Sequence, residues 1–164
     1  MTAKAHPSPG RSVDSVSCAP RHRTITIVLA DDHPGIRSAL RRMLEAEDGF
    51  EVVADAGDAE SALRSVLSHE PAVLVLDLNM PGELTSFQAI PRVCERSPGT
   101  AVVILTMQDD PSFARRALEL GALGYVLKDS ANAELVNTVR RAADGETSLP
   151  PRFGAALARG PRDH

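Results

Sequence analysis

Short apolar runs alternate with amphipathic stretches along the middle of the chain. The runs are rich in Val, Ile and Leu and are not interrupted by polar residues at every second position, which is typical of strands buried on both faces of a parallel sheet. They lie at residues 25–30, 51–54, 72–76, 101–105 and 124–127. The pattern therefore predicts five strands.

Between these runs, apolar residues recur at three- and four-residue spacing, which predicts amphipathic helices. Pro34 and Pro111 suit a first helical turn, Asp58 suits an N-cap and Gly121 suits a C-cap. Pro91 fits the third helix only if that helix starts late. The predicted helices cover about residues 34–44, 59–70, 87–96, 111–120 and 131–143.

The resulting order is strand then helix, repeated five times, which predicts an α/β fold with one parallel sheet. Right-handed crossovers require helices on both faces of such a sheet, which makes the fold doubly wound. We expect a single domain at residues 24–149. The flanks, residues 1–23 and 150–164, hold six of the twelve prolines and show no apolar periodicity, so we expect both to be poorly ordered.

Charge and composition exclude several classes of function. Residues 24–149 carry a net charge of −9, counted from the sequence, and this is not the basic face that binds nucleic acid. We therefore expect no direct DNA binding by this chain. No apolar run approaches the roughly 20 residues of a membrane span, and no apolar leader begins the chain, which predicts a cytoplasmic protein without membrane contact.

Polar side chains follow four of the five predicted strands. Asp31 and Asp32 follow the first strand, Asp77 the third, Thr106 the fourth and Lys128 the fifth. Ligands of such sheets bind at the carboxyl ends of the strands. An Asp at one strand end is more often a helix cap than a catalyst, so only the conjunction of all five residues indicates a site.

Carboxylates gathered in this way require a cation. Two of them about 4 Å apart repel by roughly 4 kcal/mol at an effective dielectric constant of 20. Oxygen ligands on an open rim suit Mg²⁺, which binds through one or two carboxylates together with phosphate and water. His33 follows the acidic pair, but a single imidazole among carboxylates argues against a softer metal. We interpret it as a cap before Pro34.

With Mg²⁺ as the cation, the other groups suit phosphoryl transfer. Asp77 stands alone at the end of the central run and is the best candidate for a carboxylate nucleophile that holds a phosphoryl group. Lys128 adds a positive charge, and the Thr106 hydroxyl can bond a phosphoryl oxygen. The turn residues of the loop at 78–82 can expose a backbone carbonyl to the metal.

These residues resemble a known family, the receiver domain of two-component response regulators, over about residues 24–149. The resemblance rests on four segments in the same order, with wording closest to the NarL/FixJ-like subgroup: IVLADDHPGIRSAL, VLVLDLNMPG, VVILTMQDD and GALGYVLKDS. It implies a flavodoxin-like fold with the strand order 2-1-3-4-5. It also implies a signalling switch whose only enzymatic activity is its own phosphorylation and dephosphorylation.

The resemblance assigns a role to each candidate residue. Asp77 would be the phosphoacceptor, and a sensor histidine kinase would be the phosphoryl donor. Lys128 would bind the phosphate, while Thr106 and Tyr125 would form a switch pair. The Mg²⁺ ligands would be Asp32 and Asp77 directly, Asp31 mainly through water, and the backbone carbonyl of Asn79.

Several alternatives stay open. A Mg²⁺-dependent phosphatase of the haloacid-dehalogenase type also uses an aspartyl nucleophile, but it needs a second Asp two residues later, where this chain has Asn79. A receiver-like interaction module that is not phosphorylated is a third reading.

The resemblance implies output through transcription regulation, but no helix-turn-helix follows residue 150. The chain is then either a stand-alone receiver or one that has lost its effector, and a receiver homodimer is also open. The loop at 83–86 departs from the family pattern, because it is one residue longer and lacks a second glycine.

Overall fold

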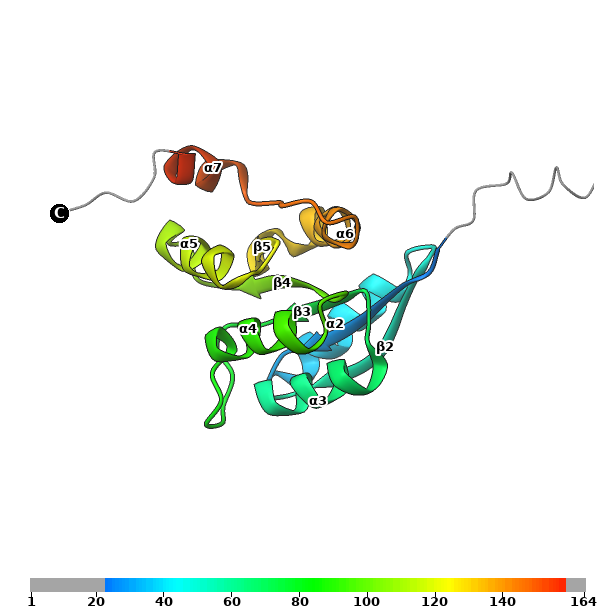
Figure 1. Ribbon diagram of the computed structural model, residues 1–164. Coiled ribbons are helices and arrows are strands. Elements are labelled where there is room, and N and C mark those ends of the chain that lie inside the picture. The colour runs from blue at the N-terminus through cyan, green and yellow to red at the C-terminus, as the bar shows by residue number, and fades with distance from the viewer. Residues whose placement is uncertain (1–22, 159–164) are drawn as a thin grey trace, which may run out of the picture.

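The computed structural model describes residues 23–158, with side chains to residue 154. A five-stranded parallel sheet forms its centre, in the order β2-β1-β3-β4-β5 (Figure 1). The strands are β1 (Ile25–Ala30), β2 (Phe50–Ala56), β3 (Val73–Leu76), β4 (Ala101–Thr106) and β5 (Gly124–Leu127). The predicted flavodoxin-like fold and strand order are confirmed.

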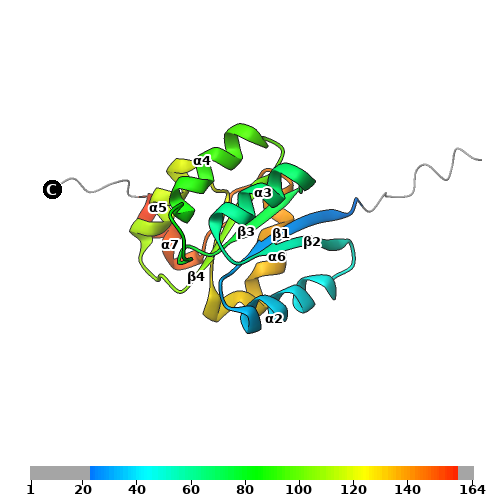
Figure 2. The same cartoon turned by 90° about the horizontal axis from the view of Figure 1, so that it is seen from below.

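Helices cover both faces of this sheet, as the crossover rule requires. They are α2 (Pro34–Glu45), α3 (Ala59–His69), α4 (Ser86–Arg96), α5 (Pro111–Leu120), α6 (Ala131–Ala143) and α7 (Pro151–Ala158). Figure 2 shows α2 and α6 together on one face, and α3, α4 and α5 on the other. Alternate residues of each strand supply the two cores. Ile27 and Leu29 face α2 and α6, whereas Val28 and Ala30 face the other group.

Local signals start and end the helices where the sequence predicts. The Asp58 carboxylate accepts a hydrogen bond from the Ser61 amide, 2.7 Å, and Asp110 accepts one from Ser112, 2.9 Å. Gly121 ends α5 with a φ of 119°, a left-handed conformation that suits glycine. These caps fix the point at which each strand-end loop turns into a helix.

The helix α4 differs from its prediction in one respect. It begins at Ser86, so Pro91 lies inside it and not in its first turn. Thr85 forms a capping box with Gln88: the Gln88 amide donates to Thr85 Oγ1, 3.1 Å, and the Thr85 amide donates to Gln88 Oε1, 2.9 Å. This reciprocal cap fixes the helix start early enough to leave the proline in the interior.

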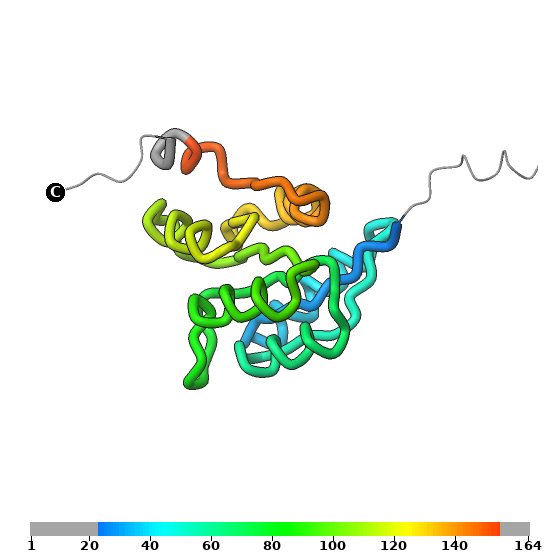
Figure 3. Tube along the Cα trace, in the orientation of Figure 1, coloured from blue at the N-terminus to red at the C-terminus, as the bar shows by residue number. Residues whose placement is uncertain are grey.

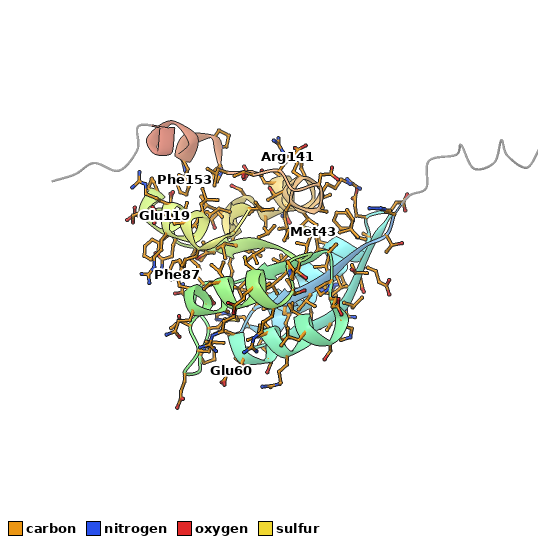
Figure 4. All side chains as sticks on the ribbon, viewed as in Figure 1. Met43, Glu60, Phe87, Glu119, Arg141 and Phe153 are labelled. Atoms are coloured by element: carbon orange, nitrogen blue, oxygen red, sulfur yellow. The ribbon has the colours of Figure 1, made fainter. Side chains whose placement is uncertain are left out.

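The C-terminal segment requires a correction. The sequence predicts a poorly ordered tail from residue 150, but Pro151–Ala158 form α7 beside α5 (Figure 1), and Figure 3 follows the trace from α6 to the start of this helix. Phe153 is only 2% exposed, and Figure 4 shows it between α7 and the body. Phe153 therefore departs from the expected poorly ordered tail, and removing its ring from water favours the ordered segment. Residues 1–22 and 159–164 lie outside the described part.

Among residues 23–158, no helix combines the length and the apolar character that crossing a membrane requires.

Candidate functional site at the carboxyl ends of the strands

The candidate side chains lie at one edge of the sheet because parallel strands end together there. The backbone pairing continues one residue past the strands: the Asp31 amide donates to Ala56 O, 3.0 Å, and the Asp77 amide donates to Ala30 O, 3.1 Å. The first bond fixes Asp31 beside the end of β2, and the second fixes Asp77 beside the end of β1 and so next to Asp31. Lys128 opens the 3-10 turn η2 (Lys128–Ser130) directly after β5.

Lys128 joins the two buried carboxylates. Its Nζ lies 2.8 Å from Asp31 Oδ2 and 2.9 Å from Asp77 Oδ2. The Asp31 and Asp77 side chains are 1% and 3% exposed, and that of Lys128 is 12% exposed. Residues from β1, β3 and β5 thus meet at one point, as the sequence predicts.

Burial and direct contact shift the pKa values of Asp77 and Lys128. Burial raises the pKa of the Asp77 carboxyl above its usual range, and the bond from Lys128 only partly offsets this effect. Burial alone would lower the pKa of Lys128, but its bonds to Asp31 and Asp77 outweigh burial and raise it. The lysine is therefore held in its charged form beside Asp77.

Asp32 and His33 complete the acidic rim. His33 Nδ1 lies 3.0 Å from Asp32 Oδ1 and 3.6 Å from Asp31 Oδ1. His33 is the N-cap residue of α2, but its side chain makes no capping bond. Its backbone amide instead donates to Asp31 Oδ1, 2.9 Å. His33 thus occupies the cap position before Pro34, as the sequence predicts, while its imidazole turns toward the carboxylates.

The donor set fits a hard cation. Asp31 Oδ2 and Asp32 Oδ1 are buried, and their contacts are with Lys128 Nζ at 2.8 Å and His33 Nδ1 at 3.0 Å. One ligand atom each from Asp31, Asp32 and His33 lies within 4.8 Å of the others. Carboxylates this close together repel one another unless a cation neutralises them, and oxygen ligands favour Mg²⁺.

Two hydrogen bonds from the residues that follow Asp77 fix its position. The Asn79 amide donates to Asp77 Oδ1, 3.1 Å, and the buried Ser86 hydroxyl donates to the Asp77 carbonyl, 2.5 Å. Sequence reasoning missed Ser86 because it treated residues 83–86 as an unusual loop. The signal was present, since Thr85 and Gln88 have the spacing of a capping box and so place Ser86 at the first helical position.

Thr106 and Tyr125 lie on the α3/α4/α5 side of the sheet but do not touch the carboxylates in any described contact. Thr106 is fully buried, and its Oγ1 accepts a hydrogen bond from the Gln108 amide, 3.1 Å. Tyr125 is 1% exposed, and its hydroxyl donates to the Gln108 carbonyl, 2.8 Å. Burial raises the pKa of Tyr125 far above its usual range, and the nearby Asp110 and Asp109 add to the effect. No sequence signal marks Gln108, because only its backbone takes part.

The comparisons with known proteins agree with each other. The response regulator receiver domain model matches residues 27–140. The oxygen regulatory protein NreC of Staphylococcus carnosus (strain TM300) is 37% identical over 131 residues, and the match covers 80% of this chain and 60% of that protein. This chain thus spans less than two thirds of the curated relatives that it matches.

Two solved structures are similar over most of the chain. A two-component response regulator of the LuxR family from Aurantimonas sp. SI85-9A1 is 35% identical with a TM-score of 0.77, covering 83% of this chain and 96% of that chain. The signal receiver domain of the response regulator NarL from Mycobacterium tuberculosis is 34% identical with a TM-score of 0.71, covering 76% and 99% of the two chains.

Proposed function

The chain belongs to the response regulator receiver domain family of two-component systems, and on this premise we propose that phosphoryl transfer from a histidine kinase to Asp77 switches it. The observation that carries the proposal is the position of Lys128 Nζ, within 2.9 Å of both Asp77 and Asp31. A lysine held between two carboxylates is ready to neutralise a third anion, the phosphoryl group, when it arrives.

Asp77 is the proposed nucleophile. One of its carboxylate oxygens forms the new P–O bond while the bond from phosphorus to the donor's histidine nitrogen breaks. Lys128 then follows the negative charge from the carboxylate to the phosphoryl oxygens. The Thr106 hydroxyl is proposed to donate to one of these oxygens, because it ends the strand next to β3.

The proposed Mg²⁺ ligands are the side chains of Asp32 and Asp77 and the backbone carbonyl of Asn79, with Asp31 acting mainly through water. The oxygens of Asp31 and Asp32, which lie within 4.8 Å of one another, support this assignment. When bound, Mg²⁺ would neutralise charge on the phosphoryl oxygens and orient the group for in-line transfer. The chain's own contribution is to keep these oxygens buried and close together before the cation arrives.

The proposed activity is that of a signalling switch, not of an enzyme with an external substrate. Family membership leaves the haloacid-dehalogenase-type phosphatase without support, and Asn79 stands where that class needs its second Asp. Transcription regulation as output, the sensor histidine kinase as partner, a homodimer and the absence of direct DNA binding are part of the proposal. So is the cytoplasmic location that the sequence predicts.

Intact mass spectrometry after incubation with acetyl phosphate tests the proposal. We expect one added phosphoryl group that requires Mg²⁺, is absent in Asp77→Asn and is strongly reduced in Asp32→Ala. Asp144→Asn is the matched control, because Asp144 caps the far end of α6 and is exposed. Equal labelling of Asp77→Asn and the parent protein would overturn the assignment of the phosphoacceptor.

A further inference from the structure

The segment that follows α6 is attached to the open edge of the sheet. The Ser148 amide donates to Leu123 O, 2.8 Å, and the Tyr125 amide donates to Ser148 O, 3.1 Å. Ser148 thus pairs in parallel with Gly124 and covers the outer edge of β5. We call residues 148–154 the strap, since they run from this edge across to α5.

The strap has one strong apolar anchor. The Phe153 ring centroid lies 5.7 Å from that of Tyr125, with the planes tilted by 53°. This is a favourable aromatic arrangement, and it buries the phenol. The second anchor is weak: Arg152 Nη2 lies 2.8 Å from Asp109 Oδ1, but both side chains are more than half exposed.

Both anchors reach the same short loop, and this loop begins at Thr106. The Tyr125 hydroxyl donates to the Gln108 carbonyl, and Arg152 pairs with the neighbouring Asp109. The Gln108 amide in turn donates to Thr106 Oγ1. Residues 106–109 therefore connect the phosphoacceptor edge of the sheet with the strap through two hydrogen bonds and one ion pair.

We propose that the strap is an intramolecular cover on the α5–β5 face, held through the loop at 106–109 and released when Asp77 is phosphorylated. This inference rests on the proposed function. If the Thr106 side chain turns to a phosphoryl oxygen, the Gln108 amide loses its acceptor and the loop rearranges. The rearrangement displaces the carbonyl that holds Tyr125 and the carboxylate that holds Arg152, and both anchors weaken together.

The site and the strap must then influence each other equally, because coupling between two equilibria is reciprocal. If phosphorylation releases the strap, loosening the strap must favour binding at the phosphorylation site. A segment with a merely structural role would not produce this second effect. The reciprocity therefore separates a switch element from a permanent part of the core.

Hydrogen exchange of the 164-residue chain with Mg²⁺ and beryllofluoride, a phosphoryl mimic, tests release directly. The Phe153 and Gly154 amides donate to Pro150 O at 2.9 and 3.3 Å, so their exchange reports the first turn of α7. We expect faster exchange over residues 146–158 when the mimic binds, and no change over α6. Tyr125 is the only Tyr and there is no Trp, so tyrosine fluorescence gives a second reading from the covered ring itself.

Affinity for the mimic tests reciprocity. We expect Phe153→Ala to bind beryllofluoride roughly fivefold more tightly than the parent, with Phe153→Leu in between. The gain should disappear in a Thr106→Ala background, where the loop is uncoupled. Phe87→Ala is the matched control, because it removes a partly buried ring that stacks on Phe113 and not on the strap.

The outcomes distinguish the two proposals. Mg²⁺-dependent binding of the mimic that is lost in Asp77→Asn supports the proposed function alone. Such binding with unchanged exchange over residues 146–158, or with unchanged affinity in Phe153→Ala, overturns the strap proposal and leaves the proposed function standing. Absence of Mg²⁺-dependent binding overturns both.

Discussion

On one face of the sheet, α2 and α6 pack mostly aliphatic side chains against the strands; on the other, the core of α3, α4 and α5 continues into a polar loop. The first face buries Leu44, Leu135 and Val139 completely. The second contains Tyr125 and Phe153, whose contacts lead by way of Gln108 to Thr106. Both faces are formed by the same strands, but aliphatic side chains cover the first face, whereas the packing on the second ends at a polar loop.

The difference shows where the fold can move. Interlocked aliphatic side chains have one arrangement, and any displacement opens a cavity. A ring on a short helix, a backbone carbonyl and an exposed ion pair can separate without leaving a void. A charge added at the sheet edge can therefore rearrange the contacts on the α5–β5 face, but not the packing on the α2/α6 face.

Leu135→Ala should have the largest effect, since it breaks the rigid face. Leu135 is fully buried between α6 and the sheet, and α6 cannot move away to fill the space. We expect a loss of about 3 kcal/mol in the free energy of unfolding, measured in urea. A loss below that of Phe153→Ala would contradict the contrast between the faces.

Gly124→Ala tests how tightly α6 lies on β5. A methyl group on Gly124 would lie 2.7 Å from Thr138 Cγ2 and 3.1 Å from Val103 Cγ2. We expect a loss of about 2 kcal/mol. Thr138→Ser removes the nearer methyl group and keeps the hydroxyl, so the double variant should recover most of the loss; no recovery would place the strain elsewhere.

Phe153→Ala should cost less, although its ring is nearly as buried as Leu135. The strap can detach as a unit, so the ordering entropy it regains offsets part of the lost burial, and we expect about 1 kcal/mol. Urea unfolding should stay a single transition. A loss as large as that of Leu135→Ala would show that the strap belongs to the rigid core.

Asp58→Asn should give the smallest effect, visible only through its pH dependence. The Ser61 hydrogen bonds lower the pKa of Asp58 below its usual 3.8. The stabilisation is therefore complete above the unfolded pKa and is lost as pH falls through the folded pKa. Asn caps the helix without titrating. The parent should therefore lose more stability than Asp58→Asn between pH 6 and 3, as measured by the urea concentration at the midpoint of unfolding. Equal losses would exclude a contribution from this charge.

Most of the fold was predictable because its signals are local or periodic. Five non-alternating runs, proline and glycine at helix ends and the Asp58 cap each act within a few residues. The early start of α4 was predictable from Thr85 and Gln88, although Pro91 suggested otherwise. The burial of Phe153 was not, because a single ring in a short segment of mostly Pro, Gly and Ala has no helical periodicity, and its partner Tyr125 lies in another element.

The sequence by itself determined the chemistry of the site: which strands end in Asp31, Asp77, Thr106 and Lys128, and hence which groups meet where parallel strands end. Only the tertiary structure decided which of these groups touch and what lies on the far side of Thr106. The physical reason is the separation along the chain of the residues that interact. A strand end is specified by its own neighbours, whereas the contact of Phe153 with Tyr125 exists only after β5, α5 and the strap have been brought together by the sheet.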